Sequence, residues 1–268
     1  MRILAIGDNC IDDYTELSRR FPGGNALNVA VYASRHDDVM ADYIGVVGTD
    51  DNGDYLLSQM RAQGLDTGKI IIRDGSTAVT KILIRDGDRV FAEYTEGVQK
   101  DAELSYERIP DPDGYDMMHF TVWGFGREHV KHLKETTDAL LSCDFSGQLD
   151  DPRTTIMPHL DISFFSGSHL IEKDKNPEPI LKKLKEKTQG IVVMTLGEYG
   201  SIAYDGETIY RGEAYPVEVI DTLGAGDAYI AEFLYSRIKG KTIQESIRAG
   251  HKAAAEICKR LGAWGGEG

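Results

Sequence analysis

The run Asp221–Asp227 (DTLGAGD) places a carboxylate at each end of a stretch of small residues. Apolar residues recur at helical spacing beyond it, so we expect a helix over Ala225–Ile238, preceded by a strand that ends at Val217–Ile220. Free amides at a helix N-terminus attract anions, and glycine lets a phosphoryl group approach the backbone closely. The segment therefore predicts phosphate-handling chemistry.

Asp227 would lie one turn inside this anion-binding helix start. As a mere neighbour its carboxylate would repel phosphate, but as a general base it could deprotonate a hydroxyl in line with the phosphoryl group. The alternative is an aspartate that only favours the helix dipole, beside glycines that only form a turn. Two glycines, a small residue and Asp221 in the same short run favour the general base.

A second glycine pair opens another expected helix, at Gly23–Asn28. Gly24 permits close backbone approach, and the side chains of Asn25 and Asn28 offer donors and acceptors to a polyhydroxy ligand. The alternative for Asn25 is helix capping. Asp12 lies just beyond the first expected strand, where it could accept hydrogen bonds from hydroxyl groups; the alternative is a solvated turn.

Thr195, Gly197 and Gly200 follow a later strand and supply a hydroxyl and a glycine turn, although this pattern alone also fits an ordinary β-turn. Two competing nucleotide motifs are missing from the sequence. It has no Gly-x-x-x-x-Gly-Lys-Ser/Thr phosphate loop, and no Gly-x-Gly-x-x-Gly follows the first strand. The latter absence disfavours an NAD-dependent oxidoreductase.

The elements that must position these residues alternate between short apolar runs and amphipathic stretches. This order predicts one α/β domain over residues 1–268, with a mainly parallel sheet and helices on both faces. The expected strands are Ile3–Gly7, Tyr43–Val47, Met117–Val122, Leu140–Phe145, Ile162–Phe165 and Ile191–Thr195. The expected helices are Gly24–Ser34, Asp51–Gln63, Glu128–Leu140, Pro179–Lys187, Ala225–Ile238 and Ile243–Leu261.

A β-rich stretch interrupts the alternation. Ala78–Ile84 and Arg89–Tyr94 flank a glycine-containing turn and predict a hairpin. Together with Asp12–Leu17 it could form a small lid sheet, over segments of about 12–18 and 76–98, above the carboxyl edge where open α/β sheets bind ligands. The alternative is an extension of the edge of the main sheet.

Composition narrows the class of partner. The net charge of −14 argues against nucleic acid and anionic membranes, and it means that a nucleotide triphosphate would have to arrive with a metal ion. Three widely spaced cysteines indicate neither a disulfide framework nor a zinc site. With no apolar run long enough to span a bilayer, we expect a soluble cytoplasmic protein.

In chain order, Gly23–Asn28, Thr195–Gly200 and Asp221–Asp227 resemble the motifs of the ribokinase-like (PfkB-type) sugar kinases, and the resemblance covers nearly the whole chain. It implies a ribokinase-like fold and ATP-dependent phosphorylation of a hydroxymethyl group on a ketose-type substrate. Within the family, the chain is most similar to kinases of the 6-hydroxyl of fructoselysine or a related fructosamine. This similarity rests on Gly7–Cys10, Gly23–Tyr32, Asp88–Phe91, Tyr94–Val98 and Gly262–Trp264.

The resemblance also implies roles for individual residues. Asp227 would activate the acceptor hydroxyl, and the backbone of Gly224, Ala225 and Gly226 would form the anion hole. The sugar would be bound by Asp12, Gly24 and Asn28, and the nucleotide site would be lined by Thr195, Gly197 and Gly200. Further implications are Mg²⁺ with the ATP, in some members K⁺ near Asp221, and a β lid through which such kinases often form homodimers.

One segment departs from the family pattern. Where these kinases usually carry Asn-x-x-Glu after a strand, this chain has Ser166-Gly167-Ser168-His169. The indirect metal role of that glutamate would then need another carboxylate, for which Asp144 is a candidate. The departure also keeps a sugar-binding sensor without turnover open as an alternative, beside another sugar or nucleoside kinase of the same family. The intact Asp227 argues against the sensor.

Charges on the expected lid suggest how a fructosamine could be distinguished from a plain ketose. The amines of fructoselysine could pair with an acidic lid residue, and its carboxylate could pair with Arg89. Strand alternation would put Arg89, Phe91 and Glu93 on one face and Tyr94 and Glu96 on the other. We favour Glu96 as the residue that faces the substrate, because the chain can bend inward at Gly97. The alternative is a solvated hairpin face.

Overall fold

The computed structural model describes residues 1–85 and 88–264, without the side chains of residues 84–90. Its main sheet has eight strands in the order β14-β13-β12-β11-β10-β9-β1-β4. The strands from β12 to β4 in this order are parallel to one another. Strand β13 is antiparallel to β12, and β14 is antiparallel to β13. Their bounds are β1 Arg2–Ile6, β4 Met40–Ile44, β9 Met117–Thr121, β10 Leu140–Asp144, β11 Ile162–Ser166, β12 Ile191–Thr195, β13 Ser201–Tyr204 and β14 Ile209–Gly212.

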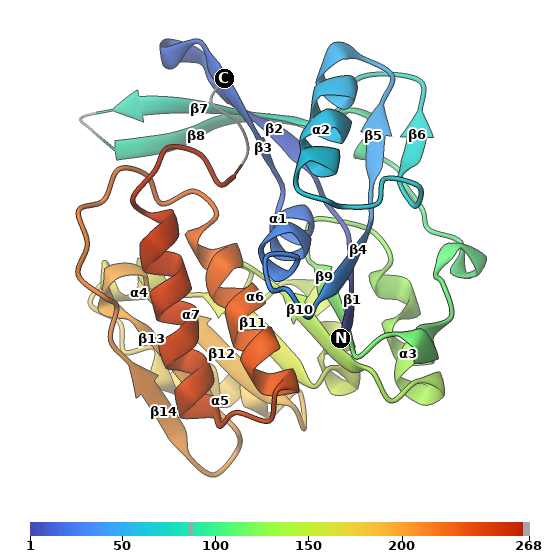
Figure 1. Cartoon of the computed structure of the whole chain (residues 1–268). Helices are drawn as coiled ribbons and strands as arrows, with labels where there is room; N and C mark the ends of the chain where they lie inside the picture. Colours follow the sequence, from blue (N-terminus) through green and yellow to red (C-terminus); the bar gives the residue numbers. More distant parts are fainter. Residues whose placement is uncertain (86–87, 265–268) are drawn as a thin grey trace.

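Helices cover both faces of this sheet because its strands are apolar on both sides. On β1, Ile3 and Ala5 belong to one buried cluster, whereas Leu4 and Ile6 belong to another. The first cluster contains residues of α1 Asn25–Ala33, α6 Ala225–Ile238 and α7 Ile243–Ile257, which lie in front of the sheet in Figure 1. The second contains residues of α3 Val130–Thr136, α4 Ser168–Ile171 and α5 Glu178–Lys185.

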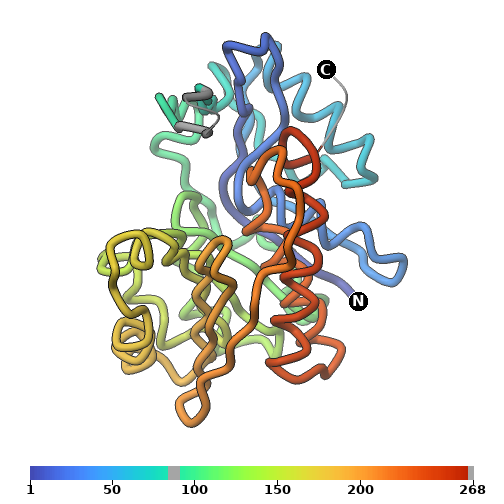
Figure 2. The backbone as a smooth tube through the Cα atoms, turned by 90° about the vertical axis from the view of Figure 1, so that its left-hand side faces the viewer, coloured from blue at the N-terminus to red at the C-terminus, as the bar shows by residue number. Residues whose placement is uncertain are grey.

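A second sheet rises from the carboxyl edge of the first. It has four strands in the order β3-β2-β7-β8, with bounds β2 Cys10–Tyr14, β3 Arg19–Gly23, β7 Val79–Arg85 and β8 Asp88–Thr95. Figures 1 and 2 show it at the top of the molecule, above the α/β body. We call this sheet the lid; its place is the predicted one, although the turn at residues 86–87 is outside the described part.

The remaining elements are one helix, a two-stranded sheet and several short 3₁₀ turns. Helix α2 spans Asp51–Ala62, and β5 Val46–Gly48 pairs with β6 Ile71–Arg73. The short 3₁₀ turns are η1 Thr15–Leu17, η2 Gly97–Gln99, η3 Tyr106–Arg108, η4 Pro112–Gly114, η5 Arg127–His129, η6 Pro152–His159 and η7 Gly197–Tyr199.

The mainly parallel sheet with helices on both faces is confirmed, and α6 has the predicted bounds. The strand expected at Val217–Ile220 is wrong: the segment carries no strand, and its apolar residues Val219 and Ile220 are exposed rather than buried in a sheet. The helix expected over Glu128–Leu140 is shorter, because α3 ends at Thr136.

Candidate active site

Two cavities meet at the N-terminus of α6. The first, of about 520 Å³, lies beneath the lid and is lined by Asp8, Cys10, Asp12, Gly24, Asn25, Asn28, Thr80, Phe91, Tyr94, Trp123, Ser146, Leu223, Gly224, Gly226 and Asp227. The second, of about 600 Å³, lies between β12, the Ala214–Thr222 segment and α7. Gly226 lines both, so the helix start is where contents of the two cavities would meet.

Asp227 lies buried in the first cavity with a fixed hydrogen-bond partner. The Asn28 side-chain amide donates to its Oδ2 at 2.7 Å, and the Trp264 indole N–H donates to Asn28 Oδ1 at 2.6 Å. Trp264 therefore turns the amide group of Asn28 toward Asp227. Burial raises the pKa of Asp227 well above its ordinary value; the Asn28 bond lowers it, and the carboxylates of Asp144, Asp8 and Asp12 raise it. These effects make Asp227 a stronger proton acceptor than a surface carboxylate.

The two glycines of the helix start have different surroundings. Gly224 has φ +75°, and a Cβ there would lie 2.5 Å from Tyr32 Oη and 2.6 Å from Ala263 Cβ. A Cβ at Gly226 would meet nothing within 4 Å. The Ala225 amide donates to the Thr222 carbonyl at 3.2 Å, so the predicted three-residue anion hole has one amide already engaged.

The start of α1 is organised by a carboxylate that the sequence did not single out. Asp8 accepts the backbone amides of Asn25 at 2.8 Å and Ala26 at 3.3 Å, so Asp8, and not Asn25, caps this helix. The Asn25 side chain instead donates to Asp144 at 3.0 Å. Gly24 has φ +103°, and a Cβ would lie 2.3 Å from Asn9 Cα, so the chain requires glycine at this position.

Asp12 extends from β2 into the first cavity and is 3% exposed, so it is not a solvated turn residue. A Cβ at Gly23 on the paired strand would lie 1.9 Å from its Oδ2. The first glycine of the Gly23–Gly24 pair thus makes room for the Asp12 carboxylate, and the second allows the close turn.

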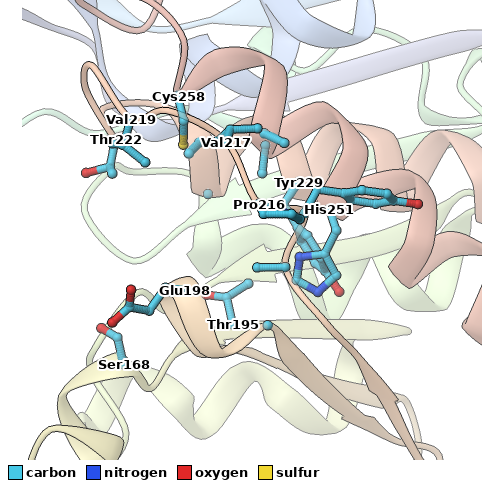
Figure 3. Close-up of a pocket in the computed structure, with 18 of the residues that line it drawn as sticks. Ser168, Thr195, Glu198, Pro216, Val217, Val219, Thr222, Tyr229, His251 and Cys258 are labelled. Carbon is cyan, nitrogen blue, oxygen red and sulfur yellow. The ribbon is translucent and has the colours of Figure 1, made fainter.

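The second cavity brings Thr195, Gly197 and Gly200 together on one wall. In Figure 3, Thr195 lies on this wall with Glu198 and Ser168, and Val217, Val219 and Cys258 lie on the other side. The lining is mostly apolar around the α7 side, as is usual for cavities that bind small molecules. It is completed by Ser166, Ala214, Tyr215, Pro216, Thr222, Ala225, Gly226, Tyr229, His251, Ala254 and Ala255.

Two residues that line this cavity, Tyr229 and His251, belong to an uncharged hydrogen-bonded chain. Ser201 Oγ lies 2.9 Å from both Tyr229 Oη and His251 Nε2. Burial lowers the pKa of His251 to about 4, so its ring is uncharged at neutral pH. The lining beside His251 therefore suits an uncharged group rather than a phosphate.

Comparison with known proteins identifies the family. Residues 16–266 match the model of the pfkB family carbohydrate kinases. The chain belongs to this family. Its kinases use ATP. We call the second cavity the nucleotide cavity and the first the sugar cavity, after the roles that the resemblance implies for the residues that line them. The predicted ribokinase-like membership is confirmed.

The relatives cover the chain almost completely. It is 40% identical to fructoselysine 6-kinase from Escherichia coli (strain K12) over 98% of this chain and 100% of the relative. It is 31% identical to fructosamine kinase FrlD from Bacillus subtilis (strain 168) over 99% and 93%. Among solved structures, ribokinase from Thermotoga maritima has a TM-score of 0.80 at 21% identity, with 98% and 94% covered, and supports the fold.

Asp221, the predicted neighbour of a monovalent cation, links the lid of the kinase to two other segments. Its carboxylate accepts from the Tyr14 hydroxyl, from the Leu223 amide at 3.0 Å and from the Gly262 amide at 2.9 Å. These bonds join the lid, the anion-binding segment and the C-terminal segment, which Figure 2 shows rising toward the lid. A K⁺ ion near Asp221 stays a prediction.

Within the described part of the chain, no group of three or more His, Cys, Asp or Glu residues could hold a metal by itself. Mg²⁺ in kinases is usually held by substrate phosphates with one or two carboxylates, so this does not conflict with a metal that arrives with the nucleotide. Ser166 and Ser168 line the nucleotide cavity, with Glu198 as its acidic residue. Asp144 instead lies beside the sugar cavity, bonded to Asn25 and Ser146.

The lid strand β8 departs from simple alternation. The pairing shifts between Lys81 and Ile82, which face Glu93 and Phe91, so Ala92 is an extra residue. Phe91 and Tyr94 consequently both line the sugar cavity, and their expected assignment to opposite faces is wrong.

Two charged lid residues, Glu96 and Arg89, are predicted to contact the substrate. Glu96 is exposed and is not among the described residues that line the sugar cavity, so its contact with substrate stays a prediction. The side chain of Arg89 is outside the described residues.

Several lining residues escaped the sequence analysis. Asp8, Trp123 and Ser146 each follow the carboxyl end of a parallel strand, so the rule that selected Asp12 could have found them. Thr80 and Tyr94 come from the lid hairpin, and only the three-dimensional pairing places them over the cavity.

In the part of the chain that the structure describes, no helix combines the length and apolar character that crossing a membrane requires.

Proposed function

We propose that this kinase transfers the terminal phosphoryl group of ATP to the 6-hydroxyl of fructoselysine or a related fructosamine. One observation carries the proposal: Gly226 borders both cavities, and the next residue, Asp227, is buried in the sugar cavity. A hydroxyl beside Asp227 would therefore face a phosphoryl group at the helix start. The two relatives described above support the choice of sugar.

Asp227 accepts the proton of the attacking hydroxyl, and Asn28 holds its carboxylate in place. The amides of Gly224 and Gly226 face the phosphoryl group and stabilise its charge, and the helix dipole adds to this effect. Mg²⁺ bound with the nucleotide would neutralise phosphate charge, and Glu198 is the carboxylate of the nucleotide cavity that could hold it. Asp12, Asn25 and Gly24 bind and orient the sugar.

A coupled assay of ADP release tests the proposal with a panel of fructoselysine, other fructosamines, fructose, ribose and adenosine. We expect the highest kcat/KM with a fructosamine, and ³¹P NMR of the product should show a phosphate ester on C6. A higher kcat/KM for ribose or adenosine, or an ester on another carbon, would overturn the substrate assignment. Binding of a sugar without turnover of any would favour the sensor.

A further inference from the structure

Three aromatic residues form the mouth of the sugar cavity. Phe91 is 59% exposed, Tyr94 48% and Trp123 47%, although all three line the cavity. Asp227, at 7% exposure, and Asn28, at 3%, lie at its deep end. We call Phe91, Tyr94 and Trp123 the aromatic rim. The cavity therefore runs from a polar, buried floor to an aromatic opening.

Among the described residues that line this cavity, the charged side chains have one sign. Asp8, Asp12 and Asp227 are among its lining residues, and the described lining contains no lysine, arginine or histidine. Asp144 lies directly behind, bonded to Asn25 and Ser146. Such a cavity attracts cations and repels anions. It is a poor fit for a sugar that already carries a phosphate.

The position of the reacting hydroxyl fixes which end of the substrate reaches the rim. On the proposed function, on which this inference rests, the 6-hydroxyl lies at Asp227. The amino substituent of a fructosamine is on C1, at the other end of the sugar, and must point toward the mouth. We infer that the aromatic rim, chiefly Tyr94 and Trp123, is the binding site for the cationic amino group of the substrate. A cation over an aromatic face is held by the ring quadrupole.

The contacts of Trp123 support this role. Its indole N–H donates to Ser146 Oγ at 3.0 Å, and Ser146 donates to Asp144 at 3.2 Å, so the ring orientation is tied to the acidic side of the cavity. The guanidinium of Arg153 lies 5.5 Å from the ring centroid and is paired with Asp151 at 2.6 Å. The ring is thus held by Ser146, which also lines the cavity, and by Arg153, which does not, while part of its surface lines the mouth.

Steady-state kinetics of rim variants with three substrates tests the inference: fructoselysine, with a cation on C1; fructose, which is neutral; and fructose 1-phosphate, which is anionic. We expect Trp123→Leu and Tyr94→Leu to raise KM for fructoselysine by about 2- to 30-fold, the range for one cation–π contact, and to leave KM for fructose within about 2-fold. Tyr94→Phe keeps the ring and should behave like wild type. Wild type should not phosphorylate fructose 1-phosphate.

Site-specific replacement of Trp123 by tryptophans with increasing fluorine content separates a cation–π contact from simple packing. Fluorine weakens the ring quadrupole with little change of shape, so KM for fructoselysine should rise stepwise and KM for fructose should not. Equal effects of the rim variants on both sugars, with wild type still preferring fructoselysine, would overturn this inference and leave the proposed function standing. If wild type does not prefer fructoselysine, the proposed function itself fails.

Discussion

Gly226 and Gly224 differ in what a side chain would meet, although both belong to the anion-binding segment. At Gly226 a valine would extend into open space shared by the two cavities. We expect Gly226→Val to keep the melting temperature close to that of wild type and to lower kcat by about 10²- to 10³-fold, the range for loss of one oxyanion donor. Thermal unfolding and coupled kinetics on the same preparation measure both quantities.

Gly224→Ala is the matched comparison. Its Cβ would press on Tyr32 and Ala263 in a left-handed conformation, so the variant should lose stability by about 1–3 kcal/mol, measured by denaturant unfolding. Wild-type turnover in Gly226→Val would place the phosphoryl group elsewhere. Wild-type stability in Gly224→Ala would contradict the packing described here.

At the scale of elements, Asp144 joins the end of β10 to the start of α1 through Asn25. Burial raises its pKa to about 6, above the value near 3.9 expected in the unfolded chain. The folded protein therefore binds the proton more tightly, and the resulting stability is present below about pH 4 and is lost as the pH rises through about 6.

Asp144→Asn removes this dependence. We expect the variant to be more stable than wild type at about pH 8, by roughly 1–3 kcal/mol, and the advantage to shrink toward about pH 5. Urea unfolding across this range measures it, with Asp150→Asn as the control because the Asp150 side chain is 86% exposed. A pH-independent difference, or a stability gain in the control, would refute the assignment to Asp144.

The elements also show what the sequence could predict. The start of α6 follows from a local pattern of small residues and helical spacing, and its predicted bounds are correct. The lid was only partly predicted. Arg19–Gly23 contains Pro22 and two arginines, so its local pattern does not indicate a strand, and it becomes one by pairing with β2. The bulge beside Ala92 leaves no signal in the sequence, so simple alternation places Phe91 and Tyr94 on opposite faces.

For the whole molecule, the net charge of −14 disfavours metal-free ATP as a ligand. We expect exhaustive EDTA treatment to abolish turnover and weaken ATP binding measured by calorimetry, and added Mg²⁺ to restore both. Ser166 and His169 stand where the family usually carries Asn and Glu. We expect activity despite this departure, without restoring Asn and Glu at these positions. Unchanged phosphorylation after EDTA would contradict this expectation.

The edges of the lid sheet lead to a prediction about the oligomeric state of the protein. Strands β3 and β8 form the edges of its sheet, and an edge strand can pair with another chain. We expect a homodimer through the lid, with about twice the chain mass of 29.7 kDa by light scattering. A monomer at the concentrations used for kinetics would exclude this mode of assembly for the active form.

The central claim is that Asp227 deprotonates the substrate hydroxyl where the two cavities meet, and the Asp227→Asn variant tests it most directly. The measurement is kcat with fructoselysine, alongside ATP affinity and melting temperature, with the surface variant Asp174→Asn as the matched control. We predict a fall in kcat of about 10²- to 10⁴-fold for Asp227→Asn, with ATP binding and folding retained and the control unchanged. Wild-type kcat in a folded Asp227→Asn protein would contradict the mechanism.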